Sequence, residues 1–117
     1  IDAAVDLLEL TAVDTVVSLL VVSHRFNPVS VMRLEHGRLV PFGDGPLITR
    51  RQEKPEVYAR NGPAVLAVRT STLLDGRLYG DDVRPLIMSA EASVDVDDAW
   101  DLETAALALS RRIRQHP

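Results

Sequence analysis

Two carboxylates lie close together in the stretch Ser93–Asp98 (SVDVDD), where apolar and acidic side chains alternate. In an extended strand, alternate side chains point to the same face of a sheet, so this pattern predicts that Asp95 and Asp97 project together. Mg²⁺ typically binds one or two protein carboxylates together with the phosphate oxygens of a substrate. The pair therefore favours a metal-assisted phosphoryl or nucleotidyl transfer site.

A structural role fits the same residues. The apolar spacing that follows predicts a helix from about Ala99 to Arg112, and Asp97 or Asp98 would then be its N-cap. Asp101 falls in the first turn of that helix, where a negative charge interacts favourably with the helix dipole. The pattern alone leaves both interpretations open, a helix cap and a metal ligand.

The first part of the chain predicts a helix followed by a buried strand. Ile1–Ala12 has apolar residues at helical spacing, and Thr15–Val22 is a nearly continuous, β-branched apolar run. Such a run is typical of a strand buried on both faces, as in a parallel sheet covered by helices. The order of these two segments predicts α/β architecture.

Shorter segments follow. Val29–Leu34 and Arg38–Phe42 predict a hairpin turning at Glu35-His36-Gly37, which suits either a subunit contact or an ordinary surface position. Later expected elements are a strand at Ala64–Arg69, a helical turn at Thr70–Asp75 and a strand at Arg84–Met88.

The densest positive charge lies in Ile48–Asn61 (ITRRQEKPEVYARN). Arginine binds carboxylates and phosphates through its planar guanidinium fork, so this run is either a solvated surface or an anion-binding patch. His24, in the turn sequence SHRFNP, is either a site residue or a locally hydrogen-bonded turn histidine.

Composition excludes several function classes. The net charge of −4 argues against a nucleic-acid backbone as the main partner. The absence of cysteine excludes disulfides, zinc–thiolate clusters and a cysteine nucleophile, and fits a cytoplasmic location. No apolar run has the length of a membrane span. No nucleophile elbow, phosphate loop or dinucleotide fingerprint occurs either.

Three features resemble those of a known family. Arg50–Pro55 (RRQEKP), followed by Tyr58 and Arg60-Asn61-Gly62, is similar to a run RRQ-(D/E)-x-P…Y-x-x-N-G. Met88 with Ser93–Asp97 is similar to a run M…SIDID, and the terminal helix is entered through Asp101-Leu102. In order and spacing, from Ile1 to about Arg111, the chain resembles the C-terminal half of acylneuraminate cytidylyltransferases, also called CMP-N-acetylneuraminic acid synthetases.

The resemblance implies a fold and a reaction. Residues 1–117 would be the C-terminal part of a doubly wound, Rossmann-like α/β nucleotidyltransferase sheet, with an inserted β-hairpin dimerisation arm at about 29–60. CTP and an acidic nine-carbon keto acid sugar would meet at the carboxyl ends of the strands of a homodimer. The anomeric hydroxyl would attack the α-phosphate, pyrophosphate would leave, and Mg²⁺ would offset the developing charge.

The resemblance also implies roles for individual residues. Asp95 and Asp97 match the metal-binding pair and are the expected catalytic residues and Mg²⁺ ligands. The expected substrate-binding residues supply positive charge and polar contacts to the sugar or the phosphates, and they are Arg50, Arg51, Gln52 and Asn61.

The family's Gly-rich phosphate-binding loop and its cytosine-binding segment have no counterpart in the sequence. We therefore expect the chain by itself to be inactive. Two alternatives are a non-catalytic, dimerising α/β interaction module and a cytidylyltransferase for 3-deoxy-manno-octulosonate or another sialic acid analogue.

Overall fold

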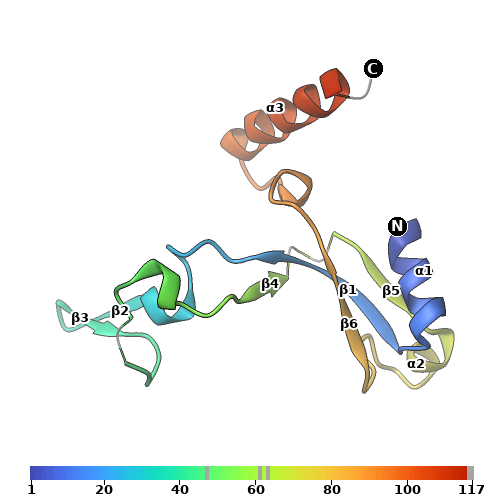
Figure 1. The fold of residues 1–117 in the computed structure, drawn as a ribbon, viewed down its shortest axis with the longest axis horizontal. Coiled ribbons are helices and arrows are strands. Elements are labelled where there is room, and N and C mark those ends of the chain that lie inside the picture. The colour runs from blue at the N-terminus through green and yellow to red at the C-terminus, as the bar shows by residue number, and fades with distance from the viewer. Residues whose placement is uncertain (47, 61, 63, 116–117) are drawn as a thin grey trace. The chain divides into compact units, whose positions relative to one another are not determined.

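The computed structural model describes residues 1–46, 48–60, 62 and 64–115, which separate into two compact units (Figure 1). Unit 1 consists of Ile1–Leu20 and Arg60–Pro117, and unit 2 of Val21–Ala59. The helices and strands are α1 (Asp2–Thr11), β1 (Thr15–Val21), β2 (Met32–Glu35), β3 (Arg38–Pro41), β4 (Tyr58–Arg60), β5 (Leu66–Val68), α2 (Thr70–Leu74), β6 (Val83–Ile87) and α3 (Ala99–Gln115).

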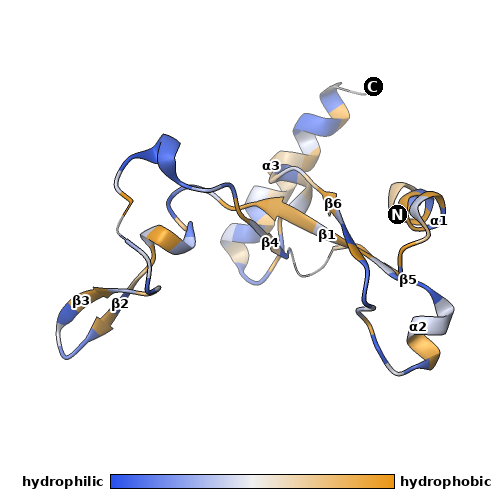
Figure 2. Cartoon of the chain, turned by 60° about the horizontal axis from the view of Figure 1, so that its bottom comes forward, coloured by the Kyte–Doolittle hydropathy of each residue, from blue (hydrophilic) through white to orange (hydrophobic). Residues whose placement is uncertain are grey.

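Strand β1 is the central element of the sheet. It pairs with β5 in antiparallel orientation and with β6 in parallel orientation, so that Thr15 lies opposite Val68 on one edge and opposite Val83 on the other. The order of the main sheet path is β4-β1-β5. A strand with neighbours on both edges and a covered face has to be apolar, and Figure 2 shows β1 as a hydrophobic strand.

The core of unit 1 forms between α1 and the sheet. Ala4 of α1 is completely buried against Val13 and Val16, at the beginning of β1. Partly buried side chains surround this contact, namely Leu7, Leu8, Val65, Ala67 and Leu86. The amphipathic spacing of the first helix therefore has the role that the sequence predicts, which is to cover the sheet.

An arginine fixes the end of α1. The guanidinium of Arg69 donates hydrogen bonds to the carbonyl oxygens of Leu8, at 2.9 Å, and of Val13, at 2.7 Å. A cation at this position satisfies carbonyl groups at the C-terminal end of the helix and interacts favourably with its dipole. The C-cap residue, Ala12, adopts a left-handed conformation with φ of 54°.

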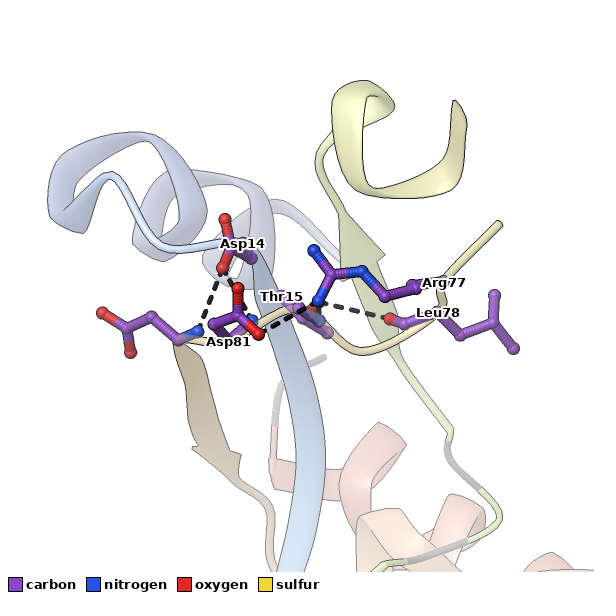
Figure 3. Close-up of polar contacts among 7 residues, drawn as sticks. Asp14, Thr15, Arg77, Leu78 and Asp81 are labelled. Carbon is purple, nitrogen blue, oxygen red and sulfur yellow. Dashed lines mark hydrogen bonds and ion pairs between the residues drawn. The ribbon is translucent and has the colours of Figure 1, made fainter. Parts of the chain in front are cut away.

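The carboxylate of Asp14 holds the loop that precedes β6 (Figure 3). Its Oδ2 accepts hydrogen bonds from the N–H groups of Asp81, at 2.9 Å, and Asp82, at 3.0 Å. The hydrogen bond from the backbone of Asp82 is the main cause that lowers the pKa of Asp14. The hydrogen bond from Asp81 and the positive charges of Arg77 and Arg69 also lower this pKa, while partial desolvation raises it. Asp14 thus ties the beginning of β1 to the beginning of β6.

Thr15 and Gly80 complete this attachment, as Figure 3 shows for Thr15. The Oγ1 of Thr15 donates to the carbonyl of Leu78 and accepts from the N–H of Gly80, both at 3.2 Å. A Cβ atom at Gly80 would lie 2.2 Å from the Cβ of Asp14. Close packing, rather than backbone conformation, therefore requires glycine at this position.

Unit 2 contains the hairpin of β2 and β3. Its two turn residues, His36 and Gly37, have φ of 50° and 77°, as expected for a two-residue turn whose twist matches the strands. The register places Leu34 opposite Leu39. The predicted hairpin is confirmed, although its first strand begins at Met32 rather than at the expected Val29.

The difference at the start of the hairpin has a local cause. Pro28–Ser30 forms a short 3₁₀ helix instead of a strand. The Oδ1 of Asn27 accepts a hydrogen bond from the N–H of Val29 at 3.2 Å, and proline is favourable in the first turn of a helix.

The described residues form a mixed α/β fold with a mixed parallel and antiparallel sheet, which confirms the predicted α/β class. The doubly wound nucleotidyltransferase sheet stays a prediction. Across the described ranges, no helix combines the length and the apolar character needed to cross a membrane.

Gly80→Ala should destabilise the fold by about 2 kcal/mol, because the new methyl group has to displace Asp14 from its two hydrogen bonds. The free energy of unfolding in urea measures this loss. Gly45→Ala is the matched control, because no atom lies within 4 Å of the position of a Cβ there. Equal stability of the two variants would contradict the packing at Gly80.

Asp14→Asn should make the free energy of unfolding depend less on pH in the acidic range. The lowered pKa of Asp14 means that its carboxylate stabilises the fold above the ordinary value of 3.8, and that this contribution disappears as the pH falls through the lower folded value. The difference in urea midpoint between wild type and variant should therefore shrink between pH 6 and pH 2. Asp6→Asn, on an exposed position of α1, controls for general charge effects. A difference that is constant with pH would contradict this role.

Candidate functional site

The stretch Ser93–Asp98 is not a strand, so the predicted geometry of the two carboxylates is wrong. Glu91–Ser93 forms a 3₁₀ helix, in which the Oγ of Ser93 donates to the carbonyl of Ser89 at 2.7 Å. Residues 94–98 continue outside regular secondary structure into α3. Alternation predicts a strand only where a neighbouring strand can pair with it, and here the local turn forms instead.

Asp98 is the N-cap of α3. Its Oδ1 accepts a hydrogen bond from the N–H of Asp101 at 2.9 Å, and the Oδ2 of Asp101 accepts from the N–H of Asp98 at 3.2 Å. This reciprocal pair is a capping box. The same Oδ2 accepts from the N–H of Asp97 at 3.2 Å, so the cap uses only the backbone of that residue. The capping interpretation is confirmed for Asp98, and the carboxylates of Asp95 and Asp97 have no part in it.

Asp95 lies beside the turn at Gly62. Gly62 has φ of 107°, a conformation that residues with a side chain rarely adopt. A Cβ atom built there would lie 3.6 Å from the Oδ2 of Asp95, so the carboxylate is next to the glycine backbone. These residues belong to the two separate motifs of the sequence, and unit 1 brings them to one place. Asn61 lies outside the described residues.

The carboxylates of Asp95 and Asp97 are candidate ligands for a hard cation. Among the described residues, the ion pairs are Arg33–Glu35, Arg50–Glu53, Arg77–Asp81 and Arg84–Asp82, so Asp95 and Asp97 take part in none of them. Both side chains are exposed, and their oxygen atoms are suitable ligands for Mg²⁺. No group of three or more His, Asp or Glu side chains in the described part of the chain has the arrangement of a metal site. Mg²⁺ sites in proteins usually combine one or two carboxylates with water and substrate oxygens.

No protein-family model matches the chain, and no curated protein matches it. Function therefore has to be inferred from the residues and their geometry.

The expected substrate-binding residues of unit 2 differ in their contacts. The guanidinium of Arg50 forms an ion pair with Glu53 at 3.3 Å, which offsets its charge. Arg51 and Gln52 lie in the short 3₁₀ helix Arg51–Glu53 with exposed side chains. Of the expected cations, Arg51 is therefore better suited than Arg50 to bind an anion.

Tyr58, in the first motif, has a local partner. Its hydroxyl donates a hydrogen bond to the carboxylate of Glu56, which raises the pKa of Tyr58 above its ordinary value. The phenol thus stays neutral at physiological pH.

The contact between Arg60 and Tyr79 has no signal in the sequence pattern. The Nη1 of Arg60 donates to the hydroxyl of Tyr79 at 3.2 Å, and the guanidinium carbon lies 5.7 Å from the ring centre. This cation–π contact fixes a positive charge close in sequence to Gly62. Tyr79 lies in an irregular loop, so no periodic pattern could have paired the two residues.

A measurement of helix content distinguishes the role of Asp98, the N-cap of α3, from that of Asp95, the candidate metal ligand. Asp98→Ala should weaken α3 by about 1 kcal/mol, because it removes the N-cap acceptor. Far-ultraviolet circular dichroism should show the lower helix content. Asp95→Asn should leave the spectrum unchanged, because Asp95 contributes no hydrogen bond to the cap. An equal loss of helix in both variants would mean that Asp95 is a structural residue.

Proposed function

We propose that the chain is the C-terminal part of a cytoplasmic nucleotidyltransferase that transfers CMP from CTP to a sialic-acid-like keto acid sugar and releases pyrophosphate. The observation that carries this proposal is the closeness of Gly62 to the carboxylate of Asp95. The two motifs of the resemblance are far apart in sequence, and their meeting in unit 1 supports a single site built from both. The mixed α/β fold supports the same proposal at the level of fold class.

In this proposal Asp95 and Asp97 would hold Mg²⁺, which would supply positive charge against the α-phosphate and the pyrophosphate leaving group. Two exposed carboxylates without an ion pair in the described part of the chain are suited to that task. Gly62, with φ of 107°, lies next to the carboxylate of Asp95. Asn61 is proposed as a supporting polar contact on the basis of the resemblance alone.

Unit 2 would contribute the subunit contact. On one face of the hairpin, Met32 lies opposite Pro41 and Leu34 opposite Leu39, and all four side chains are apolar. Leu34 and Leu39 are about 70% exposed, at 71% and 69%. A two-stranded hairpin is only marginally stable by itself, so an apolar face of this kind favours burial against a second copy of the chain. Arg51 and Gln52, with Arg50, would then provide polar contacts to the substrate from the same unit.

The apolar hairpin face also fits the second candidate, a non-catalytic dimerising module. That function would need the hairpin but would make no use of the carboxylates of Asp95 and Asp97. Activity measurements separate the two candidates. They also test 3-deoxy-manno-octulosonate and other sialic acid analogues as substrates.

Pyrophosphate release from CTP and N-acetylneuraminate in the presence of Mg²⁺ tests the proposal. The chain by itself should be inactive, whereas the chain joined to the coding sequence that precedes Ile1 should release pyrophosphate. In the joined form, Asp95→Asn should lower turnover at least about a hundredfold, because loss of a metal ligand costs more than loss of the groups that orient one.

Asp98→Asn is the matched control for this measurement. It removes the same charge but keeps an amide oxygen that can cap α3, so turnover should be retained. Unchanged turnover in Asp95→Asn would contradict the assigned role. No release from any form, with a panel of keto acid sugars tried, would favour the interaction module.

A further inference from the structure

Two loops that are far apart in sequence are tied together in unit 2. The buried side chain of Asn27 donates from Nδ2 to the carbonyl of Pro55 at 2.8 Å. The Nζ of Lys54 donates to the Oγ of Ser30 at 2.5 Å and to the carbonyl of His24 at 3.4 Å. The ammonium group of Lys54 therefore has a defined position next to the turn that carries His24.

Positive groups collect around His24. Partial loss of hydration, followed by the positive charges of Arg51, Lys54 and Arg25, lowers the pKa of His24 below its ordinary value. Every charged group that acts on this histidine is thus a cation. We call His24, Arg25, Arg51 and Lys54 the basic cluster.

Among the described residues, the basic cluster takes part in no ion pair. In the described part of the chain, the ion pairs of unit 2 are Arg33–Glu35 and Arg50–Glu53, and neither includes a member of the cluster. The hydrogen bonds of the Lys54 ammonium go to a hydroxyl and a carbonyl, which are neutral acceptors. Cations held close together repel each other, and a bound anion would remove this repulsion.

The number of cations indicates the kind of anion. Arg25, Arg51 and Lys54 supply three cationic side chains, so a single carboxylate would leave most of the positive charge without a partner. A diphosphate carries several negative charges and many acceptor oxygens, which suit guanidinium forks together with an ammonium group. The arrangement therefore favours a phosphate anion of multiple charge over a monocarboxylate.

We propose that the basic cluster binds a diphosphate, either free or carried by a nucleotide, and that protonation of His24 strengthens the binding. The proposal depends on unit 2 alone. It can therefore fail while the metal site of unit 1 stands, and it can stand while that site fails.

The direction of the pH effect follows from the thermodynamic linkage between protonation of His24 and binding of the diphosphate. Without an anion, the surrounding cations disfavour the protonated imidazole, so His24 stays neutral to a lower pH than an ordinary histidine. A bound diphosphate reverses the local charge and favours the protonated form. Binding should therefore raise the pKa of His24, and lower pH should tighten binding in return.

Nuclear magnetic resonance of the histidine rings tests this directly on the chain as it is. With saturating pyrophosphate, the His24 titration should move upward by about one pH unit. The ring of His36, at the hairpin turn, serves as the internal reference and should not move. Acetate at equal ionic strength should have a much smaller effect. An unmoved His24, or equal movement of His24 and His36, would overturn the proposal.

Two arginines of unit 2 give a matched pair of variants. Arg51→Gln should weaken pyrophosphate binding at least about fivefold, because it removes a charged donor of the cluster. Arg33→Gln should change binding less than about twofold, because Arg33 lies outside the cluster and pairs with Glu35 at 2.7 Å. Equal losses would indicate general charge screening and overturn the proposed site. In a parallel titration, tighter binding of CTP than of pyrophosphate would identify a nucleotide-borne diphosphate, and the reverse order a free one.

Discussion

The structure of unit 1 depends on strand β1, which is paired along both edges and covered by α1. The completely buried Val13 and Val16 provide its apolar contacts, while Asp14 and Thr15 bind the backbone of the loop before β6. Burial and polar attachment therefore act on adjacent residues at one end of the strand. As a result, the beginning of β6 has a defined position relative to β1, and the chain continues from β6 toward Asp95.

Both units carry charged side chains that form no ion pair among the described residues. Exposed carboxylates that form no ion pair among the described residues occur at Asp95 and Asp97 in unit 1, and cations with the same property surround His24 in unit 2. Such groups are suited to bind ligands, because their charges are not already used within the fold.

Regular elements could be predicted from the sequence where the pattern was long or the turn specific. The helix from Ala99 and the turn at His36-Gly37 are both predicted by local sequence patterns, and both form as expected. The strand at Asp95 was predicted from a short alternation, which a local turn overrides. The attachment made by Asp14 could not have been predicted, because its partners are backbone N–H groups, which no side-chain pattern reveals. For the candidate site, motif order suggested that Gly62 and Asp95 belong together, but only the structure brings them into proximity.

The central claim is that Asp95, beside Gly62, is a ligand of a divalent cation. Titration of the isotope-labelled chain with Mn²⁺, observed through its backbone amide resonances, tests this most directly. The account predicts that the amides of Gly62, Asp95 and Val96 broaden first, and that Asp95→Asn abolishes the effect while Asp98→Asn preserves it. Broadening that begins at other acidic residues, or that persists in Asp95→Asn, would contradict the account.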